Sequence, residues 1–373
     1  MHHFWSGLVW NHGSRDTLAG HPRFRWVLIL TQATTILVTW PVWQIRTAPP
    51  MLPAVSWLQL DMGPLLLISL AMICVAPRCG MLVHTALVVW AMGLDQMRMQ
   101  PPIISQVLLL WSTLPGRSAV TIGRVHLLAL WFYAGAYKLL SPYYVQGDPQ
   151  WLLRSLYPSA TDGMCLAFAW MVICAELGLA FGAWFRRTRF VAGPAAFAVH
   201  LGILFSLSPM GINWDPAVWA WNFALALSGL VLIQGWETRL LDDLRGGPAW
   251  LTAVAAVLLL APLGYSFGVV DTCFCHLLYS NHVPQARIHT ADGSVTLIDT
   301  RPQLNVPVPQ IPRLLRAHFQ AVGGPADRLE VWDPRWWYRH RGLEFVWFTH
   351  ATAEPTSRRP IFTGQPQLRA LTH

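Results

Sequence analysis

Lysine is almost absent from this sequence, and its single occurrence points to one position. Of the 26 basic residues, 25 are arginine and one, Lys138, is lysine. An ammonium group can lose its proton when it is desolvated, whereas a guanidinium stays protonated in proteins. Lys138 is therefore a candidate proton acceptor. The alternative is a cation that extends from a helix end to the membrane surface.

The residues around Lys138 favour a site between helices. Segment 131–140 reads WFYAGAYKLL, and its three small residues at 134–136 would let a neighbouring helix approach closely. Tyr137 precedes the lysine and is a candidate substrate-binding residue. A polar pocket at the outer end of this helix is the resulting expectation.

Ionisable side chains also occur in other apolar runs. Glu176 and His200 are further candidate catalytic residues, because such groups inside a membrane usually face the bundle interior and are often functional. For Glu176, a structural ion pair and a catalytic role are equally open. His126 lies near an arginine-rich boundary and is interpreted as an interfacial histidine, and His84 has no distinguishing context.

Several polar residues are predicted to share the exported half of the membrane with Lys138. They come from the segment 95–100, from the turn 208–215 and from the helix that follows it. The candidate substrate-binding residues are Asp95, Arg98, Gln100, Tyr137, Asn213 and Asn222. Their shared side follows from topology alone, so they indicate a polar site without naming its ligand.

The six cysteines do not form a zinc framework, because four of them are dispersed in or beside helices. Cys273, Cys275 and His276 form a C-x-C-H sequence after the last apolar run. These residues are weak metal candidates, for copper or another soft ion. Disulfides to other cysteines and free thiols are the alternatives, so a metal cofactor is left open.

Composition places the chain in a membrane. Hydrophobic residues make up 54% and charged residues only 12% of the sequence, against roughly 25% charged in soluble domains. A soluble protein is excluded, and the lipid bilayer is the first expected partner. The net charge of +8 comes from arginines scattered among short loops, so no nucleic-acid partner is expected. The first 25 residues lack the apolar region of a cleavable signal peptide.

Apolar runs predict about nine membrane-crossing helices. They lie near residues 26–44, 62–77, 80–94, 103–116, 121–140, 163–185, 190–208, 216–234 and 249–270. The third and fourth are short for a crossing that needs about 20 residues. The chain then divides into a cytoplasmic segment 1–25, a transmembrane bundle 26–270 and an exported appendage 271–373.

The distribution of arginine sets the expected orientation. With nine crossings and a cytoplasmic N-terminus, eleven arginines fall in cytoplasmic segments and three in exported loops. The positive-inside rule predicts this asymmetry. We therefore expect a multi-pass protein of a bacterial cytoplasmic (inner) membrane, with the N-terminus inside and the C-terminus outside.

Residues 271–373 change in character and predict a small water-facing α+β unit. Asp292 and Gly293 lie between alternating runs that predict a hairpin over 287–299. A helix is predicted over 312–322 and another strand over 343–348. The fold class is thus an all-α polytopic membrane bundle with a small C-terminal α+β appendage.

The sequence over residues 20–270 resembles the HTTM family, the transmembrane module of the vitamin K-dependent gamma-carboxylase and its bacterial relatives. The resemblance rests on segments 95–101 (DQMRMQP) and 133–139 (YAGAYKL), on Gly147 and on His200. It implies that Lys138 is the base that deprotonates a hydroquinone. Residues 101–102 are prolines near the position where the carboxylase carries a histidine, which argues against carboxylation of peptide glutamate.

Three functions are compatible with the sequence. The first is a gamma-carboxylase-like membrane enzyme, a lyase or oxidoreductase, whose lysine base acts on a quinol or on another lipid-soluble or peptide substrate. The second is a quinone-linked electron-transfer subunit like the DoxX proteins, which would need Cys273 and Cys275 if a bound metal carried the electrons. The third is a non-catalytic maturation or transport partner, for which an open aqueous path is expected.

Overall fold

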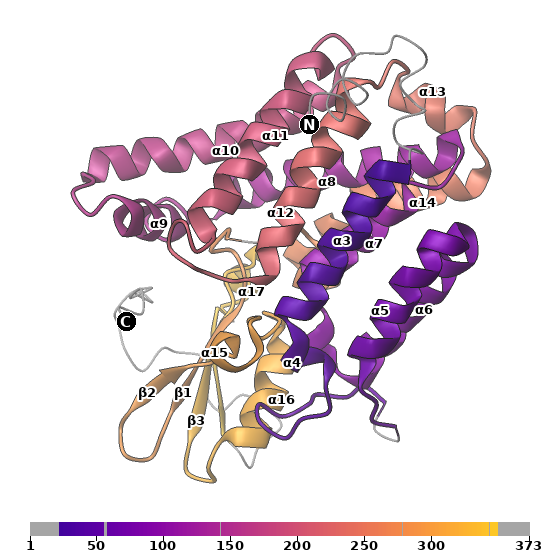
Figure 1. Ribbon diagram of the computed structural model, residues 1–373. Coiled ribbons are helices and arrows are strands. Elements are labelled where there is room, and N and C mark those ends of the chain that lie inside the picture. Colours follow the sequence, from indigo (N-terminus) through magenta and orange to yellow (C-terminus); the bar gives the residue numbers. More distant parts are fainter. Residues whose placement is uncertain (1–21, 56–57, 142, 278, 343, 350–373) are drawn as a thin grey trace.

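The computed structural model describes residues 22–349 apart from 56–57, 142, 278 and 343. The predicted cytoplasmic segment 1–25 lies almost wholly outside the described residues, and so does the end of the predicted appendage from residue 350 onward. The described part of the chain is mostly helical, with a small sheet near its C-terminal end (Figure 1).

Nine helices of the described chain run through the bundle. They are α3 (Pro22–Val38), α5 (Met62–Val75), α6 (Pro77–Leu94), α7 (Pro101–Trp111), α8 (Arg117–Leu140), α10 (Asp162–Trp184), α11 (Arg189–Leu207), α12 (Ala217–Ser228) and α14 (Ala249–Leu260). Shorter helical pieces join or extend them: α4 (Trp40–Trp43), η1 (Gln96–Arg98), α9 (Asp148–Leu156), the π-helix η2 (Gly229–Gln234), α13 (Leu240–Arg245), η3 (Ala261–Phe267) and η4 (Thr272–Phe274). Proline occupies the first turn of α6 and α7, where its missing N–H costs no hydrogen bond.

Six helices among the described residues are long and apolar enough to cross a membrane. They cover Pro77–Leu94, Arg117–Leu140, Asp162–Trp184, Arg189–Leu207, Ala217–Gln234 and Ala249–Phe267. The other three predicted crossings are the shorter helices α3, α5 and α7, with 17, 14 and 11 residues, so nine crossings are not confirmed. The third predicted crossing is longer than expected, because α6 already begins at Pro77.

Small residues bring the helices that carry the site into close contact. A Cβ on Gly135 of α8 would lie 2.8 Å from Cγ of Leu177 on α10, so only glycine fits without displacing α10. A Cβ on Gly193 of α11 would similarly lie 2.8 Å from Cβ of Gln234 at the end of η2. The predicted close approach at 134–136 is therefore confirmed, and α10 is the helix that approaches.

One end of the bundle is held together by arginines. Arg25 Nη2 donates to the carbonyl of Thr113 at 2.9 Å, which joins the start of α3 to the end of α7. Arg189 Nη1 donates to the carbonyl of Trp236 at 2.8 Å, and its guanidinium lies 3.6 Å from the centroid of that indole. Arg117 forms an ion pair with Asp243 of α13.

The opposite end of the bundle carries the C-terminal appendage (Figure 1). Asn305 Nδ2 donates to the carbonyl of Val38 at 2.7 Å, and Gln100 Nε2 donates to the carbonyl of Pro307 at 3.1 Å. Loops 44–52, 95–100 and 143–147 lie on the side of the appendage, where the hydroxyl of Tyr143 also contacts Glu344, and the α13 end lies on the other.

The appendage contains a four-stranded antiparallel sheet in the order β2-β1-β3-β4. Its strands are β1 (Gln285–His289), β2 (Val295–Leu297), β3 (Arg328–Trp332) and β4 (Phe345–Thr349), with the helices α15 (Arg301–Leu304), α16 (Pro312–Val322) and α17 (Trp336–His340). Strands β1 and β2 form the predicted hairpin, and Gly293 adopts a φ of +87° in its turn. The helix over 312–322 and the last strand are also confirmed, whereas the central strand β3 was not predicted.

Residues 271–283 differ from the prediction, which assigned them to the water-facing appendage. They pass back into the bundle, where Cys273, Cys275, Leu277, Asn281 and His282 are buried. At the deepest point the His276 ring lies 5.3 Å from that of His126 on α8. At 1.5 Å per residue, roughly 21 Å of helix separate His126 from the appendage-side end of α8. We call the described residues of this stretch, 271–277 and 279–283, the re-entrant segment.

Candidate functional site

Lys138 lies near the appendage-side end of α8 and is buried, with 4% of its surface exposed. Its Nζ atom donates to Oε1 of Glu176 at 2.8 Å and lies 3.5 Å from the carbonyl of Ala134. The same ammonium lies 5.8 Å from the centroid of the Tyr144 ring. The reading of Lys138 as a cation that extends to the membrane surface therefore does not fit its burial.

Glu176 reaches Lys138 because α8 and α10 are in close contact one turn away, where Gly135 meets Leu177. Its second oxygen, Oε2, is buried and has no hydrogen-bond partner among the described residues. Two predicted catalytic residues, Lys138 and Glu176, are thus brought together by the fold.

Tyr144 and Asp148 continue this polar path toward the appendage. Asp148 begins α9, and burial raises the pKa of its carboxyl group to about 6, although nearby Lys138 and Arg301 partly offset the rise. The pKa of Tyr144 is also raised, first by burial and then by the charges of Glu176 and Asp148.

Asn281 of the re-entrant segment holds Asp148 in place. With the Asn281 amide oriented as hydrogen bonding requires, its nitrogen lies 3.0 Å from both carboxylate oxygens of Asp148. Its oxygen accepts the backbone N–H of Asp148 at 2.9 Å. A Cβ on Gly147 would lie 1.6 Å from the position that the amide oxygen of Asn281 takes in this orientation, so glycine is required at this contact.

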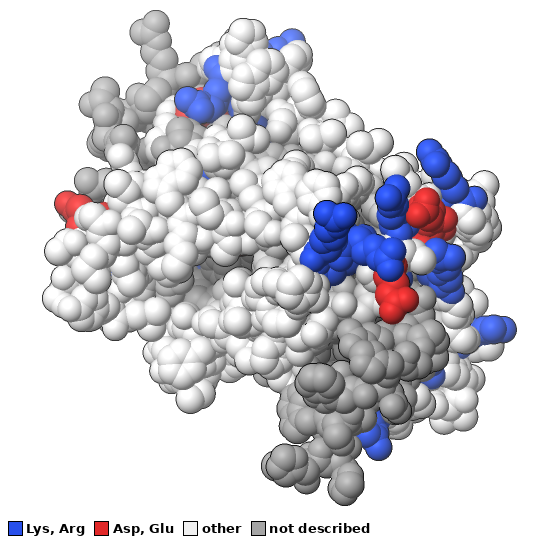
Figure 2. All heavy atoms as spheres, turned by 90° about the horizontal axis from the view of Figure 1, so that it is seen from above, with Lys and Arg blue, Asp and Glu red and all other residues white. Residues whose placement is uncertain are grey.

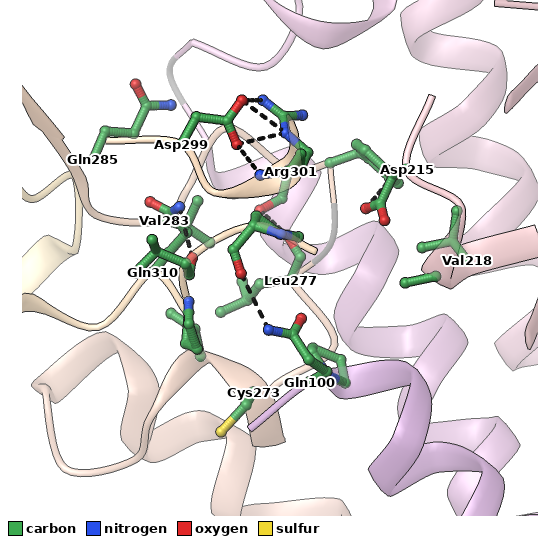
Figure 3. Close-up of a pocket in the computed structure, with 18 of the residues that line it drawn as sticks. Gln100, Asp215, Val218, Cys273, Leu277, Val283, Gln285, Asp299, Arg301 and Gln310 are labelled. Carbon is green, nitrogen blue, oxygen red and sulfur yellow. Dashed lines mark hydrogen bonds and ion pairs between the residues drawn. The ribbon is translucent and has the colours of Figure 1, made fainter. Parts of the chain in front are cut away.

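A cavity of about 250 Å³ lies between the bundle and the appendage. Its wall combines the start of α7, the start of α9, the turn before α12, the re-entrant segment and the loops around α15. Figure 3 shows Asp299, Arg301 and Asp215 along one side of this cavity and Gln100 with Cys273 at the other.

Asp215 is the most unusual residue in the cavity wall. Its Oδ2 accepts a hydrogen bond from the hydroxyl of Tyr279 at 3.2 Å, and its Oδ1 is buried without a partner among the described residues. Burial raises the pKa of Asp215 to about 6, against the opposing influence of Arg301. The pKa of Tyr279 is raised as well, mainly by burial and then by the charge of Asp215.

His200 is held in a separate hydrogen-bonded group. Its Nε2 accepts from Nε1 of Trp131 at 2.9 Å, and its Nδ1 lies 2.9 Å from Oδ1 of Asn222. Trp131 has only a donor, so His200 is neutral with its proton on Nδ1. His200 and Asn222 therefore join α8, α11 and α12, and the contacts of His200 do not include Lys138.

The predicted substrate-binding residues 95–100 mostly stabilise a corner of the bundle. Asp95 is fully buried and pairs with Arg46 at 2.5 Å, while its Oδ1 accepts the N–H of Leu52 at 3.0 Å. Arg98 donates to the backbone carbonyls of Val42 and of the two residues after it. Of this segment, Met99 and Gln100 reach the cavity.

Tyr137 and Asn213 also differ from their predicted role. The hydroxyl of Tyr137 donates to the carbonyl of Pro262 at 2.5 Å, and its ring stacks on His282 of the re-entrant segment at 5.7 Å. Asn213 is exposed in a turn with a φ of +51°. Neither side chain lines the cavity.

The two cysteines of the C-x-C-H sequence have different neighbours. Cys275 packs with Tyr133, Tyr137 and Tyr265, whereas Cys273 lines the cavity. Both thiols are free, and burial raises the pKa of Cys273 to about 12. Among the described residues, no group of three histidine, cysteine or acidic side chains is placed to hold a metal ion.

Two further histidines hold helices together. His126 is fully buried and lies 2.7 Å from Oγ of Ser105, so its interpretation as an interfacial histidine is wrong. His84 lies between Ser69 and Gln32. Its Nδ1 is 2.7 Å from Oγ of Ser69, and its Nε2 is 2.9 Å from Nε2 of Gln32.

Comparison with known proteins identifies no relative. No family model, no curated protein and no solved structure matches the chain.

Sequence reasoning did not single out Asp148, Asp215, Tyr279 or Arg301. Asp148 follows a glycine and precedes a proline, which is an ordinary start for a helix, and Asp215 lies in a turn before another proline. Both patterns are common in exposed loops. Only the return of the re-entrant segment into the bundle buries them.

Proposed function

We propose that this chain is an integral membrane enzyme in which Lys138, paired with Glu176, accepts a proton from an acidic lipid-soluble substrate of the quinol class. The observation that supports the proposal is the buried contact of 2.8 Å between the only lysine and a carboxyl group. The two side chains lie on α8 and α10, which are both long and apolar enough to cross a membrane, and this suits a substrate that arrives from the membrane.

Our proposal also includes an orientation of the bundle in the membrane and three crossings beyond the six candidate spans. Arginine side chains gather over the part of the molecule near α13, seen from above in Figure 2. In our proposal this end is cytoplasmic, and the appendage end, with the cavity, is exported. The shorter α3, α5 and α7 then cross as well, which gives the nine crossings expected from the sequence.

The proposed step is a single proton transfer. In the reactive state the proton of the pair resides on Glu176, and the Lys138 amine is neutral. A neutral pair avoids much of the cost of burying two charges, which is several kcal/mol per ion. The amine takes the hydroxyl proton of the quinol, the O–H bond breaks, and its electron pair stays on the quinol oxygen. The ammonium formed is then opposite a carboxyl group that can release its own proton toward Tyr144 and Asp148.

The resemblance to the HTTM family supports the same role for Lys138. Of the gamma-carboxylase reaction, we propose only the first step, which is removal of a proton from the quinol. Carboxylation of a peptide is not proposed, because residues 101–102 are prolines that begin α7.

Spectroscopy of a bound phenol tests the proton transfer directly. A naphthohydroquinone is added without oxygen to the protein in nanodiscs, because its anion absorbs at longer wavelength than the neutral form. We expect the anion band with the wild type and none with Lys138→Arg, since arginine stays protonated. Arg154→Lys, at an exposed position on the same side, is the matched control and should keep the band.

An anion band of full strength in Lys138→Arg would contradict the proposal. If the hydroquinone binds near Lys138 without forming an anion, a DoxX-like electron-transfer subunit is favoured. If it does not bind at all, a maturation or transport partner is favoured.

A further inference from the structure

The cavity between the bundle and the appendage contains more acidic than basic charge. Asp148, Asp215 and Asp299 line it, and Arg301 is the only basic residue among its lining residues. Arg301 is already paired, because its guanidinium donates to both oxygens of Asp299 at 2.9–3.1 Å. The guanidinium also lies 3.8 Å from the centroid of the Trp214 ring.

Asp215 and Asp148 therefore have no ion-pair partner among the described residues. Asp148 is compensated by the Asn281 amide, and Asp215 by the Tyr279 hydroxyl and the backbone N–H of Ala217. Asp215 is 93% buried, since its exposed fraction is 7%, and its Oδ1 has no partner. An unpaired buried carboxylate oxygen costs free energy unless a donor occupies the space beside it.

We propose that this cavity binds a primary ammonium group, which donates to Oδ1 of Asp215 and carries the countercharge that Asp215 and Asp148 lack. The carbon chain of the ligand then lies against Trp151, Val218 and Leu277 of the wall. The site shares Asp148 with the proposed proton path but contains neither Lys138 nor Glu176, and its test uses Asp215, which has no part in the proton transfer.

The chemistry of the wall favours an ammonium over other cations. Two isolated carboxylates do not make a metal site, and no three metal-ligating side chains converge among the described residues. An ammonium has three donors and no acceptor. Gln100 and Gln310 use their amide nitrogens on backbone carbonyls, which leaves their amide oxygens as further acceptors.

The size of the cavity limits the ligand. Its volume of about 250 Å³ is below the roughly 300–1,000 Å³ of sites for drug-sized molecules. A short alkylamine or the side chain of one lysine fits this limit. The source of the ammonium is therefore either a free small amine or a lysine of an exported peptide.

The charged and titratable neighbours of both carboxyl groups predict how binding depends on pH. Tyr279, Arg301 and Asp299 act on Asp215, and Lys138, Arg301, Tyr144 and Tyr279 are coupled to Asp148. Burial outweighs the nearby cations, and each carboxyl has a pKa of about 6. Below that pH the carboxyl groups become neutral, and an ammonium loses its partner.

Ligand-observed NMR on the protein in phosphatidylcholine nanodiscs measures the binding. The probe is n-butylammonium, and 1-butanol is its uncharged isostere. We expect saturable binding of the ammonium at pH 7.5, and at least about tenfold weaker binding of the alcohol. Lowering the pH to 5 should weaken binding about tenfold, because about a tenth of a carboxyl group with a pKa of 6 stays ionised there.

Two variants distinguish binding at this site from nonspecific attraction of the ammonium to acidic residues on the surface. Asp215→Asn should weaken n-butylammonium binding at least about tenfold. Asp162→Asn makes the same change at a residue whose side chain is 91% exposed, and it should leave binding unchanged. Circular dichroism and a melting curve verify that both variants fold.

A second arm identifies the source of the ammonium. Binding of acetyl-Gly-Lys-Gly-amide more tightly than n-butylammonium would assign the site to a peptide lysine, and the reverse would assign it to a free amine. Equal binding of 1-butanol, loss of binding in Asp162→Asn, or full binding in a folded Asp215→Asn would each overturn the proposal. So would displacement of the probe by micromolar calcium, which would indicate a metal site.

Discussion

Nζ of Lys138 lies 2.8 Å from Oε1 of Glu176, and this contact joins the only lysine of the chain to an acidic residue deep in an apolar helix. In the six helices that are long enough to cross a membrane, Glu176 is the only acidic residue beyond a first turn. The only lysine is therefore paired with the only acidic residue that lies beyond the first turn of these six helices.

Removing one partner of this pair should destabilise the protein more than removing both. Lys138→Met leaves a buried carboxyl group without its cation, and breaking such a pair typically costs about 3–5 kcal/mol. In Lys138→Met/Glu176→Leu no charge remains, so much of that loss should be recovered. Melting temperatures in one detergent measure the difference. Equal melting temperatures for the single and double variants would show that the pair is not energetically coupled.

Asp215→Asn should stabilise the protein near neutral pH. The folded pKa of about 6 exceeds the ordinary aspartate value of 3.8, so the folded state binds protons more tightly than the unfolded state. The stability of the wild type should therefore fall as the pH rises from about 4 to about 6. A shift of this size corresponds to roughly 3 kcal/mol.

The stabilising effect should disappear at low pH. Melting curves of wild type and Asp215→Asn should differ at pH 8 and converge at pH 4, where the carboxyl group is already neutral. Asp162→Asn should follow the wild type throughout. A variant less stable than the wild type at pH 8 would mean that the charge of Asp215 is compensated within the fold.

Two glycines on facing helices should respond in opposite ways to alanine. A Cβ on Gly135 would lie 2.8 Å from Leu177, whereas a Cβ on Gly178 meets nothing within 4 Å. Gly178→Ala should be neutral or stabilising by up to about 1 kcal/mol, because alanine is the better helix former. Gly135→Ala should lower the melting temperature and the yield of the hydroquinone anion by displacing α10. Similar melting temperatures for the two variants would contradict the tight contact.

His200 should be needed for stability and not for proton transfer. His200→Ala leaves the Trp131 N–H and the Asn222 oxygen buried without partners, at about 1–3 kcal/mol for each group. We expect a lower melting temperature and an unchanged hydroquinone anion band per folded molecule. Loss of the band in a folded variant would restore the catalytic role that the sequence indicated.

Reporter fusions test the orientation. Alkaline phosphatase fused after His373 should be active and green fluorescent protein at the same position should be dark, since only the former matures outside the cytoplasm. The reverse pattern, with fluorescence at the C-terminus, would place the appendage and the cavity inside the cell.

The part of the site that sequence could predict depends on local signals. Lys138 is unique in residue type, and Gly135 lies in a run of small residues, so both can be read from a few neighbouring positions. Their close contact with α10 follows from that run. The Glu176 pairing was one of two open readings, because sequence alone does not fix the rotation of α10 against α8.

Other parts could not be predicted because they depend on distant segments. Polar residues after an apolar run normally leave the membrane, and the return of residues 271–283 is visible only through its contacts with α8 and α9. Asp148 and Asp215 acquire their burial from that return. Strand β3 was missed for a similar reason, since Arg328–Trp332 becomes a central strand only by pairing with β1 and β4.

The re-entrant segment also has a consequence for biogenesis. It is among the last parts of the bundle to be synthesised, and it fills space between α8 and α9 that earlier helices leave open. A nascent chain released before residue 283 would present a water-accessible vestibule lined by Tyr137, Asp148 and Asp215. The re-entrant segment therefore closes this space only in the final stretch of translation. Until then, quality-control proteases would have access to the open end of the bundle.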